Sequence, residues 1–353
     1  MGYVISGIQQ VGIGVCDAEE AFRWYRVAFG MDICVFKDEA QATLMTRYTG
    51  QEVHSRYAIL AMNMEGGGGF EIWQYTSRKP QPLSSPMSFD QLGILVVKLK
   101  TRNIETSHHR IRDVRPACIT GIMTNPVGRK HFYVLDPFGN WFEVIEADHF
   151  FLTTHGATGG VCGCVLGVSQ MDSSIRYFRS FGLDTVDSDT IQRLCGDKAL
   201  PESARAFRRV FLSQSQPMKG PFGQLLGPVT LELLEIQGEK GAHVYHNRQW
   251  GDPGFIHLCF DVREMNTLGL HLAQTNRPFT VDSSTSFDMG KAAGHFSYHE
   301  DPDGTLIELV ETHKLPLLPK LGWHLRLKNQ RKPLPKWLLG MMRFSRIQPA
   351  TLQ

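Results

Sequence analysis

The sequence predicts an α+β protein built from four tandem β-α-β-β-β modules, and two internal repeats are the evidence for it. The segment Asp136–Glu146 (DPFGNWFEVIE) reappears as Asp301–Glu311 (DPDGTLIELVE). In both copies Pro sets the φ of a turn and Gly supplies its positive φ, and a strand with one Glu among apolar residues follows. Repeats of this kind indicate a chain assembled from similar units.

The second repeat marks the beginning of two modules. Val15–Arg26 matches Val168–Arg179, and each copy is closely followed by Phe-Gly. The apolar residues of the first copy fall on one helical face, and Gly30 is suited to end that helix. A short apolar strand precedes each helix, so both copies begin with a strand and a helix.

Strand-like stretches after the helices complete the modules. They include 57–62 and 70–75 in the first module, and 209–212 and 229–236 in the third. The modules cover about 1–80, 86–148, 160–236 and 250–312. A Pro- and Ser-rich connector at 78–86 and a Gly- and Thr-containing connector at 149–160 support these boundaries.

Composition agrees with this organisation. The chain has 353 residues, of which 42% are apolar and 20% charged, as is usual for a soluble globular protein with two domains. No apolar run is long enough for a membrane span, and the N-terminus lacks the features of a signal peptide. The seven cysteines have no disulfide-framework spacing, so reduced thiols and a cytoplasmic location are expected.

The C-terminal end differs from the modules. Residues 313–353 form a basic, partly apolar tail with nine of the 37 Lys and Arg residues and none of the 35 Asp and Glu residues. This tail is expected to pack on its own acidic modules or on a neighbouring subunit; the alternatives are an anionic membrane surface and partial disorder. Nucleic-acid binding is not indicated, because the basic character is confined to the tail and no recognition motif occurs.

On these repeats the chain resembles the vicinal oxygen chelate superfamily, which includes glyoxalase I, extradiol dioxygenases and bleomycin-resistance proteins. The resemblance rests on the Val-x-Asp-like junctions, the Phe-Gly helix ends and the two Asp-Pro-x-Gly…Glu segments, and it covers residues 1 to about 312. It implies that modules pair into two barrel-like mixed sheets. Consecutive modules would then form a first glyoxalase-like domain at 1–148 and a second at 160–312.

The resemblance also implies metal ligands on the first and last strand of each module. The first-strand position lies five residues before a Val, and the last-strand position is a Glu. The expected set of the second domain is His257, Glu308 and Glu232, with Gly163 at the remaining position. The second candidate set, from the first domain, is Gln10, Glu71, Gln91 and Glu143, whose oxygen atoms suit hard cations.

These assignments have structural alternatives. A strand Gln or Glu can be hydrogen-bonded or point to solvent, and a His in the dense apolar strand around His257 can be a core residue. His295, Tyr298 and His299 precede the second Asp-Pro turn, and they are candidate catalytic residues if they face the cavity.

The leading hypothesis is an enzyme that uses one divalent metal ion (Fe, Mn, Zn or Ni). The ion would chelate two neighbouring oxygens of a small substrate and stabilise an enolate or catecholate, as in glyoxalase or extradiol dioxygenase chemistry. The alternative is a metal-free binding protein of the bleomycin-resistance type. Because four modules lie in one chain, either a monomer or a homodimer is compatible with the sequence.

Overall fold

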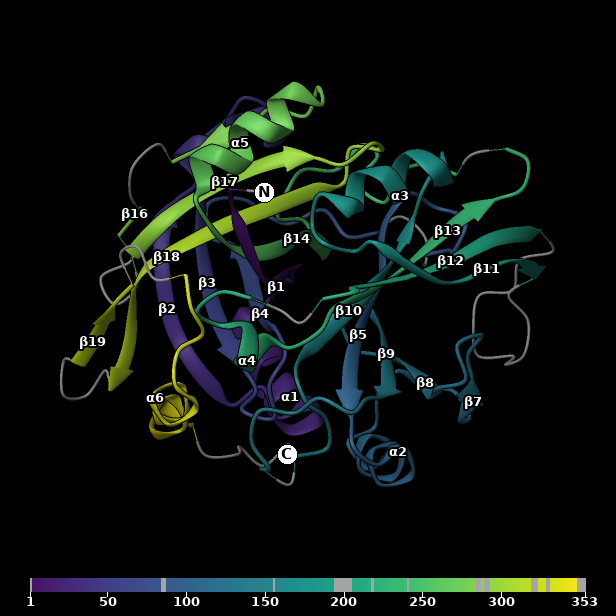
Figure 1. Ribbon diagram of the computed structural model, residues 1–353, viewed down its shortest axis with the longest axis horizontal. Helices are drawn as coiled ribbons and strands as arrows, with labels where there is room; N and C mark the ends of the chain where they lie inside the picture. The colour runs from purple at the N-terminus through teal and green to yellow at the C-terminus, as the bar shows by residue number, and fades with distance from the viewer. Residues whose placement is uncertain are drawn as a thin grey trace.

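The computed structural model describes residues 2–83, 87–154, 156–193, 205–216, 219–239, 241–283, 287–288, 293–318, 323–327 and 331–347. Four modules follow one another in the predicted order (Figure 1). The first contains β1 (Val4–Gly14), α1 (Ala18–Phe29), β2 (Ile33–Gln41), the 3-10 helix η1 (Thr43–Tyr48), β3 (Ser55–Met62) and β4 (Gly69–Tyr75). The second contains β5 (Gly93–Thr101), α2 (Ile104–Asp113), β6 (Cys118–Ile119), β7 (Met123–Thr124), β8 (Lys130–Leu135) and β9 (Trp141–Glu146).

The last two modules repeat this plan with additions. The third contains β10 (Val161–Gly167), α3 (Met171–Arg179), β11 (Thr185–Arg193), β12 (Ala206–Ser213), α4 (Gly223–Leu226) and β13 (Thr230–Ile236). The fourth contains β14 (Gly254–Arg263), α5 (Met265–Gln274), β15 (Val281–Asp282), β16 (Phe287–Asp288), β17 (Ala293–Glu300) and β18 (Leu306–Leu318). The tail adds β19 (Trp323–Arg326), α6 (Lys336–Gly340) and the 3-10 helix η3 (Met341–Ser345).

The modules pair into two curved mixed sheets, as predicted, and these lie side by side in Figure 1. In the described part of the chain, sheet A has ten strands along the path β15-β17-β18-β14-β1-β4-β3-β2, with β16 and β19 attached at β17 and β18. Sheet B has nine along β11-β12-β13-β10-β5-β9-β8-β6, with β7 attached at β8. Sheet A therefore joins the first and fourth modules, and sheet B joins the second and third.

The expected pairing of consecutive modules is wrong, and the division at 1–148 and 160–312 does not follow the sheets. In each module the last strand pairs with one edge of the first strand, as β4 pairs with β1. The other edge pairs antiparallel with the first strand of another module: β1 with β14, and β5 with β10. The second and third modules thus pair with each other in sheet B, and the first and fourth pair with each other in sheet A. Both sheets pack on the same core.

The repeated sequence motifs form the predicted local structures. The carboxylate of Asp301 accepts hydrogen bonds from the backbone N–H groups of Asp303 and Thr305, both at 2.8 Å. Asp136 makes the equivalent turn, and Gly139 and Gly304 have φ of 91° and 87°. Asp17 caps the N-terminus of α1, and Gly30 ends that helix with φ of 65°.

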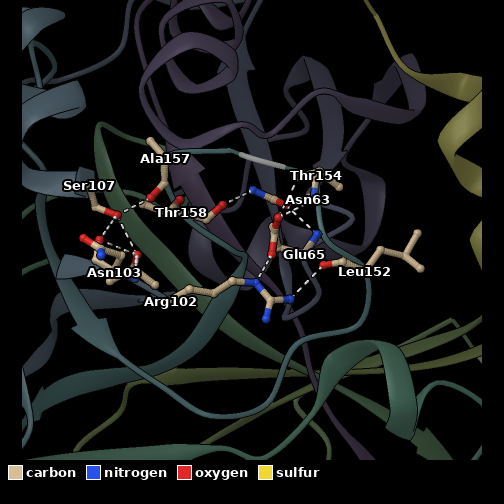
Figure 2. A network of polar contacts seen from close by, with 10 residues as sticks. Asn63, Glu65, Arg102, Asn103, Ser107, Leu152, Thr154, Ala157 and Thr158 are labelled. Atoms are coloured by element: carbon tan, nitrogen blue, oxygen red, sulfur yellow. Dashed lines mark hydrogen bonds and ion pairs between the residues drawn. The ribbon is translucent and has the colours of Figure 1, made fainter. Parts of the chain in front are cut away.

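A buried polar network joins sheet A to the connector before β10 (Figure 2). The Asn63 amide, just after β3, donates to the Thr158 carbonyl at 2.8 Å. The Glu65 carboxylate accepts from Arg102 at 2.9 Å and from the Thr154 hydroxyl at 3.1 Å. These bonds fix the two sheets relative to each other.

A run of glycines allows close backbone contact at the same junction. Gly68 forms a bridge with Val161 at the start of β10, and the Gly67 N–H donates to the Leu225 carbonyl of α4 at 2.8 Å. A side chain at Gly67 would collide with the backbone of Gly160. The glycines between β3 and β4 therefore bring α4, an element of the third module, against sheet A.

The described part of the tail packs on its own chain. The Leu334 N–H donates to the Pro221 carbonyl beside α4, and the Ile347 N–H donates to the Asp32 carbonyl before β2. Arg346 pairs with Asp32 at 3.0 Å. Leu339 and Met342 are buried against sheet A, so the basic tail covers this sheet. Among the helices of the described residues, none has the length and apolar character needed to cross a membrane.

Candidate metal centre

Four polar side chains converge on the inner face of sheet A, one from each of its four central strands. They are Gln10 of β1, Glu71 of β4, His257 of β14 and Glu308 of β18, and they are called site A. His257 Nε2 lies 3.3 Å from Glu71 Oε2 and 3.1 Å from Glu308 Oε2. Gln10 Nε2 lies 3.4 Å and 3.1 Å from the same two oxygens. One atom from each residue thus faces a common point.

The donor set of site A fits a divalent metal ion. Glu71, His257 and Glu308 offer ligand atoms within 4.8 Å of one another. Gln10 Oε1 is buried and has no hydrogen-bond partner among the described residues, and rotation of the amide would direct this oxygen to the common point. One imidazole, two carboxylates and one amide oxygen form a mixed nitrogen and oxygen set, which suits Zn, Fe, Mn or Ni.

The charge balance of site A supports a cation at this point. Burial alone would lower the pKa of His257, but Glu308 and Glu71 outweigh it and raise the pKa to about 9. Burial alone would raise the pKa of Glu308, but His257 holds it below its usual range. Two buried carboxylates require a positive partner, and a metal ion would take this role after displacing the imidazole proton.

A glycine makes room for the histidine. Gly12 lies opposite His257 in the antiparallel pairing of β1 and β14, and a Cβ at Gly12 would collide with the imidazole ring. The ring therefore lies across the backbone of β1, where it reaches both carboxylates.

Site A borders a cavity of about 310 Å³. Gln10, Glu71, Tyr298 and Glu308 line it, so three of the four candidate ligands are accessible from it. The Tyr298 hydroxyl hydrogen-bonds to Glu308, and burial together with the two carboxylates raises the pKa of Tyr298 well above its usual value. A molecule in the cavity can thus reach both the ligand atoms and a phenol.

The corresponding point of sheet B is occupied by side-chain cations. Lys98 Nζ of β5 lies 2.5 Å from Glu143 Oε2 of β9 and 2.6 Å from Glu232 Oε2 of β13. His131 Nδ1 lies 2.7 Å from the other Glu143 oxygen, and Arg209 Nε lies 2.5 Å from the other Glu232 oxygen. These five residues, called site B, are all buried.

The charge states of the site B residues are determined by their pairing with one another. Burial alone would raise the pKa of Glu143 and Glu232, but Lys98, His131 and Arg209 outweigh it and hold both below the usual range. Burial alone would lower the pKa of Lys98, but the two carboxylates raise it. Site B is therefore an ion cluster that holds its own positive charge.

Strand register shows that the two sites are related. Gly12 is the partner of Glu71 in the parallel pairing of β1 and β4, and Lys98 is the partner of Glu143 in that of β5 and β9. Lys98 thus occupies the position of Gly12. Its antiparallel partner is Gly163, which occupies the position of His257. A lysine from one strand replaces a histidine from the opposite strand.

The structure groups the predicted ligand residues differently from the two predicted sets. Gln10 and Glu71 from the first set combine with His257 and Glu308 from the second, because the outer modules share sheet A. Glu143 and Glu232 meet in sheet B, so the assignment of Glu232 to a site with His257 is wrong. Gln91 precedes β5, where its Oε1 accepts from the Ser88 N–H at 3.0 Å.

The prediction of Gln91 as a ligand rests on its position five residues before Val96. Helix α2 begins after its N-cap Asn103, as α1 begins after Asp17, so Thr101 corresponds to Val15. The position five residues before Thr101 is Val96 itself. The sequence did contain a sign of site B, since Lys98 stands in an otherwise apolar strand and a buried ammonium needs a partner.

The three candidate catalytic residues occupy different environments. Tyr298 is at the cavity beside Glu308, and its catalytic role remains a prediction. His295 and His299 are not among the described residues that line the cavity, so the condition for their role is not met. His295 pairs with Asp282 at 2.6 Å, and His299 bonds to the Tyr177 hydroxyl at 2.6 Å. Burial lowers the pKa of His299 to about 3.

The comparisons with known proteins agree with this geometry. Residues 7–144 match the sequence model of the Glyoxalase/Bleomycin resistance protein/Dioxygenase superfamily. The predicted resemblance to this superfamily is confirmed. No curated protein sequence matches the chain.

Solved structures extend the glyoxalase fold over most of the chain. A glyoxalase I mutant from Zea mays is 13% identical, with a TM-score of 0.53 over 86% of this chain and 92% of that one. A putative dioxygenase from Bacillus subtilis is also 13% identical, with a TM-score of 0.55 over 87% of this chain and 86% of that one. At this identity the likeness shows the fold alone.

Proposed function

We propose that site A binds one divalent metal ion and that the protein is a metal-dependent enzyme acting on a small substrate with two neighbouring oxygens. The observation that carries this proposal is the convergence of Gln10, Glu71, His257 and Glu308 from four strands, with the amide oxygen of Gln10 buried and unpaired among the described residues. Membership of the glyoxalase and dioxygenase superfamily supports the same chemistry.

When bound, the metal ion would lower the pKa of a substrate hydroxyl and stabilise the negative charge of an enolate or catecholate. The residues of the chain have separate tasks. Glu71 and Glu308 border the cavity and are the groups placed to accept a substrate proton. Tyr298 donates to Glu308 and so orients this carboxylate. Apolar side chains form most of the cavity wall around these groups.

The cavity itself also supports a second candidate function, a metal-free binding protein of the bleomycin-resistance type. Trp73 and Trp250, which line the cavity, could hold a ligand without any chemistry. Metal content separates the two candidates.

The first experiment is elemental analysis of protein purified without chelators or metal-affinity steps, before and after reconstitution. We expect about one equivalent of metal per chain, which the His257→Ala variant loses. The matched control is His131→Ala, which changes the histidine of site B and should retain the metal. If the metal persists without His257, the assignment to site A is wrong. If no metal binds after reconstitution, the binding-protein candidate replaces the enzyme.

A further inference from the structure

The cavity beside site A is walled mainly by apolar side chains. Sheet A contributes Leu60, Met62, Trp73 and Phe296, and Trp250 comes from the segment before β14. Trp73 and Trp250 form an edge-on pair with ring centroids 4.6 Å apart. Trp73 lies two residues after Glu71 on β4, so these aromatic faces begin next to the candidate ligands.

Further apolar residues reach the cavity from outside sheet A. Leu225 and Leu226 belong to α4 of the third module, and Met342 belongs to η3 of the tail. Their positions are set by the bond from Gly67 to the Leu225 carbonyl and by the burial of Leu339 and Met342 on sheet A. The volume available to a ligand is therefore bounded in part by segments of the chain that do not belong to the modules carrying site A.

The cavity offers no unpaired positive charge among its described lining residues. Arg56 is the one basic side chain there, and it is 9% exposed. Its guanidinium lies 2.9 Å from the Asp38 carboxylate and also donates to the Asp38 carbonyl at 2.9 Å. A divalent ion would balance Glu71 and Glu308. A negatively charged group elsewhere on the substrate would thus be buried without a counter-charge, at a large cost in free energy.

From these observations we propose that the natural substrate of site A is an uncharged molecule with an apolar body, which the cavity holds against Trp73, Trp250, Leu225 and Met342. Its two neighbouring oxygens point to site A. The proposal rests on the proposed function and names its substrate class. It excludes substrates whose body carries carboxylates, such as peptide conjugates.

A series of chelating probes with one head group tests this inference. Hydroxamic acids carry two neighbouring oxygens, and three of them differ only in the body: acetohydroxamic acid, 2-naphthohydroxamic acid and 6-carboxy-2-naphthohydroxamic acid. Calorimetric titration of the Zn-loaded protein gives their dissociation constants. We expect the naphthyl probe to bind at least about 100-fold more tightly than the acetyl probe, because burial of a large apolar area is favourable. The carboxylated probe should bind at least tenfold more weakly than the naphthyl probe.

A charge introduced into the cavity wall should reverse this preference. In the Met342→Lys variant the carboxylated probe should gain at least tenfold relative to the naphthyl probe. The matched control is Leu270→Lys, at a leucine that is 69% exposed on α5, and it should leave the ranking unchanged. The proposal is overturned if the carboxylated probe binds the wild-type protein as tightly as the naphthyl probe. It is also overturned if the naphthyl body adds no affinity. Both outcomes are read from the wild-type protein and do not depend on the variant folding.

A last probe separates this inference from the proposed function. N-phenyl-1-naphthylamine is neutral and apolar but has no chelating oxygens, and its fluorescence increases in an apolar site. It should bind the metal-free protein in one equivalent and compete with the naphthyl hydroxamate. Binding of this probe without any metal uptake would contradict the proposed function alone. One bound metal with no binding of either naphthyl probe would contradict the substrate class alone.

Discussion

Sites A and B occupy the same position in two related sheets, yet they balance their charges in different ways. Each keeps two last-strand carboxylates, Glu71 and Glu308 in one and Glu143 and Glu232 in the other. Site A offers an imidazole and an amide and opens into a cavity. Site B places the ammonium of Lys98 between its carboxylates, and the Lys98 ammonium and the Arg209 guanidinium lie 5.3 Å and 5.0 Å from the ring centroid of Phe211.

This difference shows that a pair of buried carboxylates determines only that a cation must be present. The opposing residues decide whether the cation belongs to the chain or comes from solution. In site B the ammonium is part of the fold, so its contribution is to stability. In site A the proposed metal ion would come from solution and would be exchangeable, which is the condition for metal-dependent chemistry.

The largest expected effect comes from removal of the ammonium of site B. Lys98→Met leaves Glu143 and Glu232 close together without a cation between them, and breaking a buried ion pair typically costs about 3–5 kcal/mol of unfolding free energy. Denaturant titration measures this loss. The control Lys130→Met removes an exposed lysine from its pair with Glu105 and should leave the midpoint unchanged. Similar midpoints for the two variants would show that site B does not stabilise the fold.

A pair of matched carboxylate variants separates the roles of the sites. Glu71→Gln should weaken metal binding by at least the roughly 100-fold that changes around a metal site can cause, with a small effect on stability. Glu143→Gln should lower the stability and leave metal binding unchanged, since it disrupts a buried pair but touches no candidate metal ligand. Metal content and denaturant titration on both variants check this. Loss of metal from Glu143→Gln would show that the two sites are not independent.

A cavity in place of the lysine should convert site B into a metal site. Lys98→Ala leaves the carboxylates of Glu143 and Glu232 with no ammonium between them, while His131 pairs with the other oxygen of Glu143. These side chains are all potential ligands. Zinc at about 100 times its dissociation constant should then restore roughly 2.7 kcal/mol of the lost stability. Elemental analysis should find a second equivalent of zinc, which the wild-type protein lacks. A variant that stays at one equivalent and gains no stability from zinc would rule out this relation between the sites.

A smaller effect is expected from the glycine that faces His257. The Cβ of Gly12→Ala collides with the imidazole ring, so the ring must shift from both carboxylates. We expect a reduction in metal affinity of about tenfold, the low end of the range for altered ligand orientation. Gly340→Ala serves as the control for the change from glycine to alanine, since its Cβ meets no atom and neither Gly340 nor Gly12 has a positive φ. Unchanged metal affinity in Gly12→Ala would show that the ring position is not critical.

Acid titration gives the smallest effect near pH 7, because the carboxylates of Glu143 and Glu232 are ionised there. The folded-state pKa values of Glu143 and Glu232 lie below the ordinary 4.5. Their stabilisation is therefore complete above about pH 4.5 and is lost as the pH falls through the depressed values. The unfolding free energy should fall steeply below pH 4.5 in the wild type and less steeply in Lys98→Met, where the part of the pKa depression that comes from Lys98 is lost. Parallel curves for the two proteins would argue against this account.

The local elements were predictable because short-range chemistry determines them. The Asp-Pro-x-Gly turns, the α1 helix with its Asp17 cap and Gly30 end, and the four last-strand Glu residues all follow from neighbouring residues. The candidate residues Gln10, Glu71, His257 and Glu308 were likewise recognisable one by one. Lys98 was not recognisable in this way, because it stands at the position of Gly12 and not at a first-strand ligand position.

The sequence by itself therefore determined the modules, their strand order and the residue types at the first- and last-strand positions. Only the tertiary structure decided which modules share a sheet, and hence that Gln10 and Glu71 meet His257 and Glu308. The reason is physical: the free edge of each first strand presents the same backbone groups, so a repeat does not specify its partner. That choice depends on how the helices, the glycine-rich junction and the polar network around Glu65 pack between the sheets, and these contacts join residues far apart in the chain.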